Sequence, residues 1–493
     1  MISNRFLKST LSYSVAGALP MLSGLILLPF YTNRLDTADY GILMLYVAFS
    51  LFIQILVSYS IDAYMGTHYT EVRDDEAKKK ALIANSAGLL LVIGTVFILT
   101  AMVAGKPLFD LTFNRSAVLN FYPYGIMSVV TGFFNSFFRA YTYILIYERR
   151  PGLFFILNFS NFALTIAISI IGLHMYPNSL VGPMYGRLLS GAGIFLMSLI
   201  GFISLSGISF RFNLLKGLHA FCIPYVLYVL LTWVSANIDR FLINDLIDPE
   251  GVAIFDFAVK CTLLIDFVQT GMASAIYPEV FGIWTKENST GTTKESNRYF
   301  HSLTGLSMVM ICLFMVFIPM MIPMLVKRND FFASFELMGI LAASFAVRGV
   351  YYYFVSIILH LRKTRLLLYA FALSAAVQIP LTYLLTKEWG VNGAAFAALA
   401  AKIVQCLLLY FITKKHFEIS MNVAKMVIVP LILVVALCGV WYLTGKWNAL
   451  YYGLLSIVFI AIIFFQYRKE IELLLKKFLK KKAPASPDAN NGQ

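Results

Sequence analysis

The chain has 493 residues, of which 59% are hydrophobic and only 13% charged, and it carries a formal net charge of +14. Because soluble proteins are about 25% charged, this composition excludes a soluble globular protein. Apolar stretches of about 20 residues, long enough to cross a bilayer, recur from one end of the sequence to the other. The sequence therefore predicts an all-α polytopic membrane protein.

About fourteen membrane spans are predicted from hydropathy and turn signals. The first is longer than the apolar region of a cleavable signal peptide, which has roughly 7–15 residues, so we expect it to be retained as a span. In chain order, the spans are expected near residues 10–33, 40–64, 81–105, 118–145, 152–174, 181–205, 217–243, 252–278, 299–326, 334–359, 366–386, 391–413, 424–444 and 448–467.

The distribution of basic residues predicts the orientation of these spans. With the N-terminus in the cytoplasm, 26 of the 39 Lys and Arg residues fall in cytoplasmic segments and seven in outer loops. Cytoplasmic loops of membrane proteins are enriched in Lys and Arg, so both termini are expected to lie in the cytoplasm. The positive charge then reflects membrane topology, and nucleic-acid binding is not expected.

The cysteine and histidine residues give no indication of a disulfide framework, a metal site or a cofactor. The six His residues are scattered, without the spacing of metal ligands. The five cysteines lie in apolar spans at unrelated spacings, where free Cys behaves as a small hydrophobic residue. They are Cys222, Cys261, Cys312, Cys406 and Cys438.

Three pairs of short segments repeat at nearly the same distance along the chain. One pair is ILIYERR at 144–150 and IILHLRK at 357–363. LDTADYGIL at 35–43 resembles IDPEGVAIF at 247–255, which lies 212 residues later. SLVGPMYGRL at 179–188 resembles GVNGAAFAAL at 390–399, which lies 211 residues later. The offset covers an even number of spans, so the repeats are parallel, as in transporters whose two lobes flank a substrate site.

This repeat predicts the domain organisation. Two pseudo-symmetric lobes of six helices each, residues 1–210 and 211–420, are followed by two extra helices at 421–467 and a basic cytoplasmic tail at 468–493. The first part of the tail places apolar residues at helical spacing among lysines. That pattern fits either a short interfacial helix on anionic membrane lipids or a solvated basic end to the last span.

Several short motifs resemble those of a known transporter family. They are LPFYTNRLDTADYGIL at 28–43, NIDRFLIN at 237–244, DPEGVAIFDFA at 248–258 and EWGVNGAAFAALA at 388–400. In order, helix number and length, residues 1–465 resemble the Wzx-type polysaccharide flippases of the multidrug/oligosaccharidyl-lipid/polysaccharide exporter superfamily. Gly41, Asp239 and Arg240 belong to these motifs, and the resemblance implies a structural role for them.

The resemblance implies a fold like that of the multidrug and toxin extrusion transporters and a function without enzymatic chemistry. It implies that an undecaprenyl-pyrophosphate-linked oligosaccharide moves from the inner to the outer leaflet of the bacterial cytoplasmic membrane. Alternating access between the two lobes would drive this movement with a gradient of H⁺ or Na⁺. The product would serve surface polysaccharide such as the O-antigen of lipopolysaccharide, with contacts to a polysaccharide polymerase and a chain-length regulator.

Basic residues within the spans are the candidates for substrate binding. A charge at the centre of a membrane helix costs about 2.5–3.5 kcal/mol on insertion scales, so it usually faces a cavity or a partner. Cations from both lobes would suit a diphosphate headgroup through charge-assisted hydrogen bonds. The alternative for each is a structural pair with a carboxylate or with helix-end carbonyls. The candidates are Arg139, Arg187, Lys260, Arg348 and Lys402.

Three acidic residues are candidates for ion coupling or gating. Asp256 lies four residues before Lys260, so the two share a helix face and can pair. Asp266, nearly mid-span, either exchanges H⁺ or Na⁺ or pairs with an intramembrane cation. Asp62 either gates the inner mouth or lies at a solvated helix end.

The charged segment around residues 237–260 looks at first like an active site. We expect Asp239 and Arg240 to end the seventh span and to meet loop groups there. The acidic residues that follow are suited to the start of the eighth helix, because its N-terminal dipole favours negative charge, and Pro249 is suited to its first turn.

Two other functions compete with a flippase. A drug/cation antiporter of the same superfamily would favour acidic residues in its cavity, whereas this chain favours basic ones. A membrane polysaccharide polymerase or glycosyltransferase would usually have a large external loop and a constellation of paired carboxylates. No loop exceeds about twenty residues, which leaves no room for a soluble domain of roughly 50–250 residues.

Overall fold

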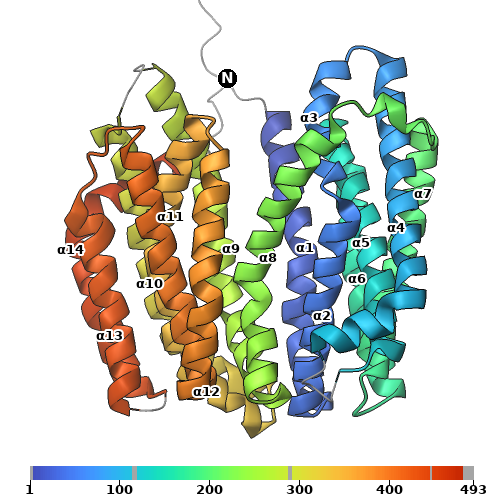
Figure 1. Ribbon diagram of the computed structural model, residues 1–493. Helices are drawn as coiled ribbons and strands as arrows, with labels where there is room; N and C mark the ends of the chain where they lie inside the picture. The colour runs from blue at the N-terminus through green and yellow to red at the C-terminus, as the bar shows by residue number, and fades with distance from the viewer. Residues whose placement is uncertain (1–3, 114–118, 287–290, 445–446, 481–493) are drawn as a thin grey trace, which may run out of the picture. The chain divides into compact units, whose positions relative to one another are not determined.

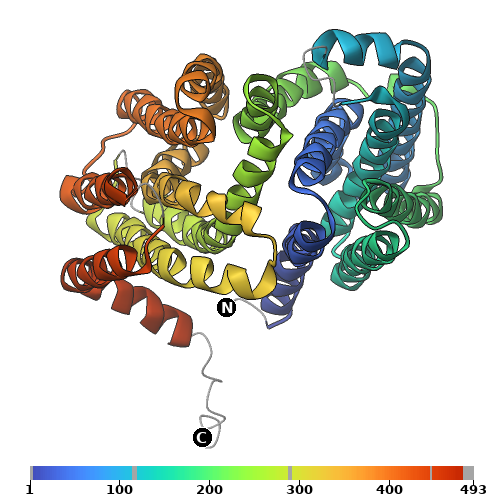
Figure 2. The ribbon, with the colours of Figure 1, turned by 90° about the horizontal axis from the view of Figure 1, so that it is seen from below.

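The computed structural model describes residues 4–113, 119–286, 291–444 and 447–480, and these residues are almost entirely helical (Figure 1). Within these ranges no strand forms, and the one β-bridge joins Gly291 to Glu418. Figure 2 looks nearly along the helix axes, so that most helices are seen end-on. The prediction of an all-α polytopic protein is confirmed.

The chain divides into two compact units. Unit 1 comprises residues 1–257 together with the short segments 325–332 and 386–391, and unit 2 comprises residues 258–324, 333–385 and 392–493. Unit 1 therefore includes the helix that the repeat assigned to the second lobe. The lobe boundaries at 210 and 420, which rest on the sequence repeat, stay a prediction.

Unit 1 contains the first eight α-helices and the start of the ninth. Helix α6 packs against α1 and α7, and α2 packs against α5 and α8. The bounds are α1 (Asn4–Arg34), α2 (Thr37–Ser58), α3 (Ile61–Val72), α4 (Glu76–Phe113), η1 (Phe121–Gly125), α5 (Ile126–Tyr147), α6 (Pro151–Met175), α7 (Val181–Ser206), η2 (Phe212–Leu214), α8 (Leu218–Leu246) and α9 (Pro249–Lys286).

Unit 2 contains most of α9 and the helices that follow it. Helix α11 packs against α13, and the Ser456 hydroxyl of α14 donates a 3.0 Å hydrogen bond to the Cys312 carbonyl of α10. The bounds are α10 (Lys294–Leu325), η3 (Asn329–Ala333), α11 (Ser334–His360), α12 (Arg365–Lys414), η4 (Ala424–Ile428), α13 (Val429–Thr444) and α14 (Ala449–Lys480).

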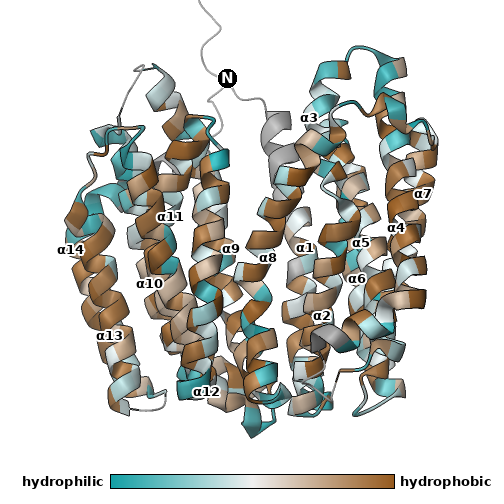
Figure 3. Cartoon of the chain, viewed as in Figure 1, coloured by the Kyte–Doolittle hydropathy of each residue, from teal (hydrophilic) through white to brown (hydrophobic). Residues whose placement is uncertain are grey.

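Every predicted membrane span falls on a helical stretch of the described chain, and brown apolar residues run along the middles of the helices in Figure 3. Ten of these stretches are long and apolar enough, by length and composition, to cross a membrane. Helix α12 holds two predicted spans. It turns at Gly390, where φ is 61° and ψ is −144°, a conformation that glycine adopts most easily.

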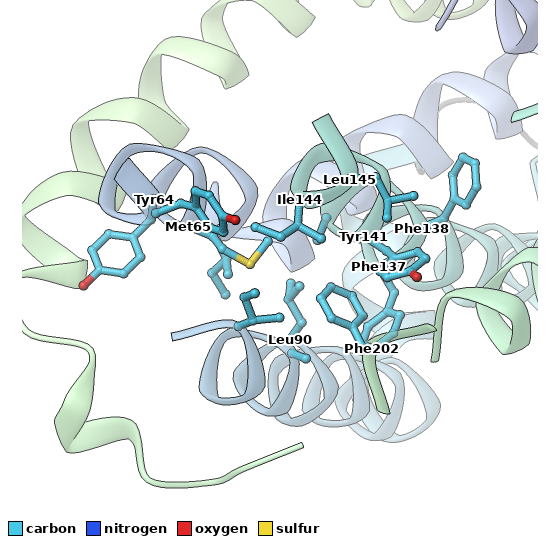
Figure 4. Close-up of a cluster of buried hydrophobic side chains, with 14 of the residues drawn as sticks. Tyr64, Met65, Leu90, Phe137, Phe138, Tyr141, Ile144, Leu145 and Phe202 are labelled. Atoms are coloured by element: carbon cyan, nitrogen blue, oxygen red, sulfur yellow. The ribbon is translucent and has the colours of Figure 1, made fainter. Parts of the chain in front are cut away.

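The core of unit 1 is built by aromatic and aliphatic side chains of α3, α4, α5 and α7 (Figure 4). The rings of Phe137 and Phe202 meet edge to face with 5.1 Å between their centroids, and both side chains are fully buried beside Met65 and Leu90. Lipid tails are as apolar as these side chains, so close van der Waals packing rather than the hydrophobic effect holds such helices together.

The last helix continues into the predicted tail. Helix α14 extends to Lys480, and the Lys425 amino group lies 2.5 Å from the Glu470 carboxylate at the base of this extension. The start of the tail is thus helical, and whether it lies on anionic lipid or is a solvated basic end stays open between the two predicted alternatives. Residues 481–493 lie outside the described residues.

Candidate functional site

A break between α2 and α3 positions the first candidate acidic residue. Tyr59 and Ser60 have positive φ angles of 46° and 55°, and α3 begins directly after them. Asp62 therefore lies in the first turn of a new helix, and only 2% of the residue is exposed. The expectation of a solvated helix end was wrong, because Asp62 is buried and the chain continues as helix α3.

Arg139 of α5 is the partner of Asp62. Its Nε donates a 2.8 Å hydrogen bond to the Asp62 carboxylate, yet 42% of the arginine side chain is exposed, against 3% for the aspartate. Within the described part of the chain, no other hydrogen bond or ion pair involves this guanidinium. One edge of the guanidinium is thus oriented by the carboxylate, and its Nη groups remain available to an anion.

Aromatic and polar groups surround this pair in unit 1. Tyr143 and Tyr225 are close enough to interact electrostatically with Asp62. On the neighbouring turn, the Tyr59 hydroxyl lies 3.1 Å from Nδ1 of His219 in α8. The surroundings offer ring faces and hydroxyl groups, the chemistry that sugar rings contact.

Unit 2 contains a second pair of the same kind. Arg348 of α11 forms an ion pair with Asp266 of α9, and both side chains are 27% exposed. The Thr270 hydroxyl donates to Asp266 over 3.0 Å and also lies 3.0 Å from the Tyr352 hydroxyl, which must then donate to it. Asp266 thus pairs with an intramembrane cation, which was one of its two expected roles.

Aromatic rings complete the second pair. The Arg348 guanidinium lies 5.3 Å from the ring centre of Tyr352 and 5.5 Å from that of Phe345, within the range of cation–π attraction. Tyr277 donates a 3.4 Å hydrogen bond to the Tyr352 carbonyl. Thr270 and Tyr277 follow Asp266 at helical spacing, so a search for polar residues on its helix face would have found them.

A third pair is fully enclosed. In α8, Arg240 donates from Nε to Asp256 over 2.8 Å and from Nη1 to the Ala236 carbonyl over 2.7 Å. The Tyr40 hydroxyl donates to the other oxygen of Asp256 over 2.9 Å. Because the Arg240 side chain is only 10% exposed, this pair joins helices. Helix α8 continues to Leu246, so the expectation that Arg240 meets loop groups at a helix end was wrong.

Gly41 allows α2 to approach the start of α9. A Cβ atom at this position would lie 1.9 Å from the Pro249 carbonyl oxygen and 3.2 Å from the Ala253 nitrogen, both backbone atoms. The two segments of the first repeated motif therefore contact each other within unit 1. Asp239, the remaining motif residue, is buried on α8.

Sequence comparison assigns the chain to a family. The model of the family described as polysaccharide biosynthesis protein matches residues 6–284, which is more than half of the 493 residues. The chain belongs to this family. No curated protein matches it closely enough in sequence to count as a relative.

Solved structures show the fold of this polysaccharide biosynthesis family member in proteins of low sequence identity. The chain is similar to the lipid II flippase MurJ in an inward closed conformation, with a TM-score of 0.68, 13% identity, and coverage of 95% of this chain and 99% of that one. It is also similar to an inward-facing multidrug resistance MATE family transporter of the MOP superfamily, with a TM-score of 0.64, 15% identity and coverage of 80% and 97%.

A third similar structure is a complex of the MATE multidrug transporter DinF-BH, with a TM-score of 0.59, 15% identity and coverage of 86% and 97%. At these identities the likeness establishes the fold. The structural neighbours themselves are a lipid II flippase and multidrug transporters. The prediction of a multi-pass membrane protein is confirmed.

The remaining candidate cations of this family member come from α7, α9 and α12. Lys260 is half-buried on α9, and Lys402 is exposed on α12. Arg187 of α7 is partly buried and interacts electrostatically with Tyr31 of α1. The gathering of these cations around one cavity stays a prediction, as does a pair between Asp256 and Lys260.

No cluster of three or more His, Cys, Asp or Glu side chains with metal-site geometry occurs among the described residues. All five cysteines are free thiols, four of them buried. The chemistry offered by the site is therefore that of guanidinium groups, carboxylates and tyrosine hydroxyls.

Proposed function

We propose that this family member is a flippase for lipid-linked oligosaccharides. It moves an undecaprenyl-pyrophosphate-linked glycan from the inner to the outer leaflet of the bacterial cytoplasmic membrane, with both termini in the cytoplasm. The match to the polysaccharide biosynthesis family and the fold shared with a lipid II flippase support this proposal. The glycan is destined for surface polysaccharide, such as O-antigen.

The observation that carries the proposal is the half-exposed guanidinium of Arg139. A diphosphate accepts hydrogen bonds most strongly from the paired N–H groups of arginine, whose planar fork matches two phosphate oxygens. Asp62 holds the Nε edge at 2.8 Å and thereby fixes the direction of the other edge. Arg348, 27% exposed beside Tyr352, is the corresponding group in unit 2.

Charge balance suggests how an ion gradient would be coupled to this binding. Without substrate, Asp62 and Asp266 neutralise the two arginines. When the diphosphate draws an arginine toward itself, the carboxylate is left with an uncompensated charge at membrane depth, which is costly. Uptake of H⁺ or Na⁺ by that carboxylate removes the cost, so the binding of a cation to the carboxylate is linked to the position of its arginine, and an inward gradient of that cation can act on the alternating-access cycle.

Reconstitution tests this function. Purified protein in liposomes should move a lipid-linked oligosaccharide from the inner to the outer leaflet, where a glycan-binding probe outside the liposome detects it. This movement should be faster with a proton or sodium gradient than without one. Arg139→Ala should reduce this rate, whereas Arg73→Ala, which removes an exposed arginine at the end of α3, should leave it unchanged. Equal rates for both variants and the unsubstituted protein would remove Arg139 from the mechanism.

A drug/cation antiporter is the second candidate function. It is favoured by the fold shared with MATE multidrug transporters and by the carboxylates Asp62 and Asp266 within the helical units. A strain that lacks the protein distinguishes the two. Loss of surface polysaccharide with unchanged resistance to cationic dyes supports the flippase, and the reverse result supports the antiporter.

A further inference from the structure

Unit 1 contains an apolar cavity of about 510 Å³, and no residue of the charged pairs lines it. Its walls come from α2, α4, η1, α5 and α8, and every lining residue except Thr100 and Asp245 is apolar. Seven of the lining side chains are aromatic. The volume falls within the roughly 300–1,000 Å³ range of pockets that bind small molecules.

The aromatic walls brace one another, so the cavity is a built feature. Phe52 lies with its ring centre 5.0 Å from that of Trp233, and Phe49 lies 5.4 Å from Phe109. The Trp233 indole donates a 3.1 Å hydrogen bond to the Ala48 carbonyl, which fixes the ring between α8 and α2. Side chains held in this way cannot collapse to fill the space.

The rim of the cavity is continuous with the lipid-facing surface of α4. Leu108, which lines the cavity, is 57% exposed. Met102 and Val103 of the same helix are 60% and 86% exposed. Apolar side chains this open on a membrane-spanning helix are those that contact lipid tails. A hydrocarbon chain can therefore reach the cavity from the bilayer along these exposed apolar side chains of α4.

Water is a poor occupant, because a stable buried water needs two to four polar partners and this lining offers almost none. An apolar cavity of about 150 Å³ holds one benzene ring. The present volume of about 510 Å³ has room for about three such six-carbon groups, on the order of one fatty acyl chain.

We propose that this cavity holds an acyl chain of a bilayer phospholipid. Phospholipid is the most abundant molecule around the lipid-facing surface of α4. Its high concentration keeps the cavity filled by mass action even if its affinity is modest. An isoprenoid tail has the same apolar chemistry but is far more dilute in the membrane. The site is independent of the transported substrate and of the direction of transport.

Photo-crosslinking tests this proposal. Protein in vesicles of phosphatidylethanolamine and phosphatidylglycerol, with a trace of phospholipid carrying a diazirine in one acyl chain, should crosslink at the inner wall residues Phe52, Phe97 and Trp233. The crosslinks are located by peptide mass spectrometry. Crosslinks confined to the outward side chains Met102 and Val103 would overturn the proposal, and this map needs no variant.

A matched pair of variants sharpens the result. Ala101→Phe fills the cavity from α4, whereas Leu99→Phe adds bulk two residues away on an exposed position. Crosslinking of the inner wall should fall by about tenfold in the first variant, equivalent to ~1.4 kcal/mol of binding, and stay unchanged in the second. Equal crosslinking in both variants overturns the proposal. So does loss of the signal on adding undecaprenyl phosphate at a few molar per cent, which would assign the site to an isoprenoid.

Discussion

The three arginine–aspartate pairs formed by Arg139, Arg240 and Arg348 have the same chemistry but different surroundings. The Arg240 side chain is 10% exposed and makes further bonds to backbone, whereas those of Arg348 and Arg139 are 27% and 42% exposed. Removing one partner of a buried pair strands a charge, while an open arginine can turn to solvent or to an anion. Exposure therefore separates the arginine that holds helices together from those that can bind a substrate.

Neutralising Asp62 and Asp256, two paired aspartates of unit 1, should give opposite phenotypes. Asp256→Asn leaves Arg240 buried without its counter-charge and should destabilise the protein by about 3–5 kcal/mol. Asp62→Asn leaves a half-open arginine, so stability should change little while transport driven by an ion gradient is lost. Thermal unfolding of the purified variants and flipping in liposomes measure the two effects. Similar losses of stability in both variants would contradict the distinction.

Single-residue roles could be predicted only in part from the sequence. Charges within apolar spans are visible, and Asp266 with Thr270 and Tyr277 follows a helical period. The partner of Arg139 could not be predicted from the sequence, because Asp62 lies 77 residues away and is brought near by tertiary packing. The turn at Tyr59 and Ser60 contains neither Gly nor Pro, so it carries no breaker signal.

At the scale of helices, the long apolar runs in the sequence made the membrane spans predictable. The break in α12 also followed from its sequence, since Gly390 separates two apolar runs. Close approach between helices is less visible, because a glycine in an apolar helix can be a contact point or simply a small residue. Gly41 is of the first kind, and Gly439 of α13, with open space where its Cβ would be, is of the second.

These two glycines make a matched test of helix packing. Gly41→Ala places a methyl group 1.9 Å from the Pro249 carbonyl oxygen, so α2 and α9 must separate and the purified protein should melt at a lower temperature. Gly439→Ala adds the same group without a clash and should raise stability by about 0.5–1 kcal/mol, as alanine favours helix over glycine. If both variants melt alike, the contact at Gly41 does not support the fold.

At the scale of the whole molecule, the two open pairs come from corresponding helices of the predicted repeat. Helices α3 and α5 belong to the second and fourth spans of the first lobe, and α9 and α11 are the second and fourth of the other lobe. By the offset of 212, Asp266 and Arg348 lie about two turns and one turn from the positions equivalent to Asp62 and Arg139. The predicted repeat thus assigns the two pairs to corresponding helices, with their residues shifted by one to two turns along the sequence.

The orientation of the whole chain in the membrane follows from its basic residues and can be tested with cysteine labelling. The native cysteines are largely buried, so the unsubstituted protein serves as a control of low background. Asp74→Cys, in the exposed loop after α3, should stay unlabelled by a membrane-impermeant maleimide in spheroplasts and react after lysis. Pro177→Cys, in the exposed loop after α6, should react in both. The expected pattern follows because positively charged loops are retained in the cytoplasm. The reverse pattern would place both termini outside. The proposed direction of flipping would then fail.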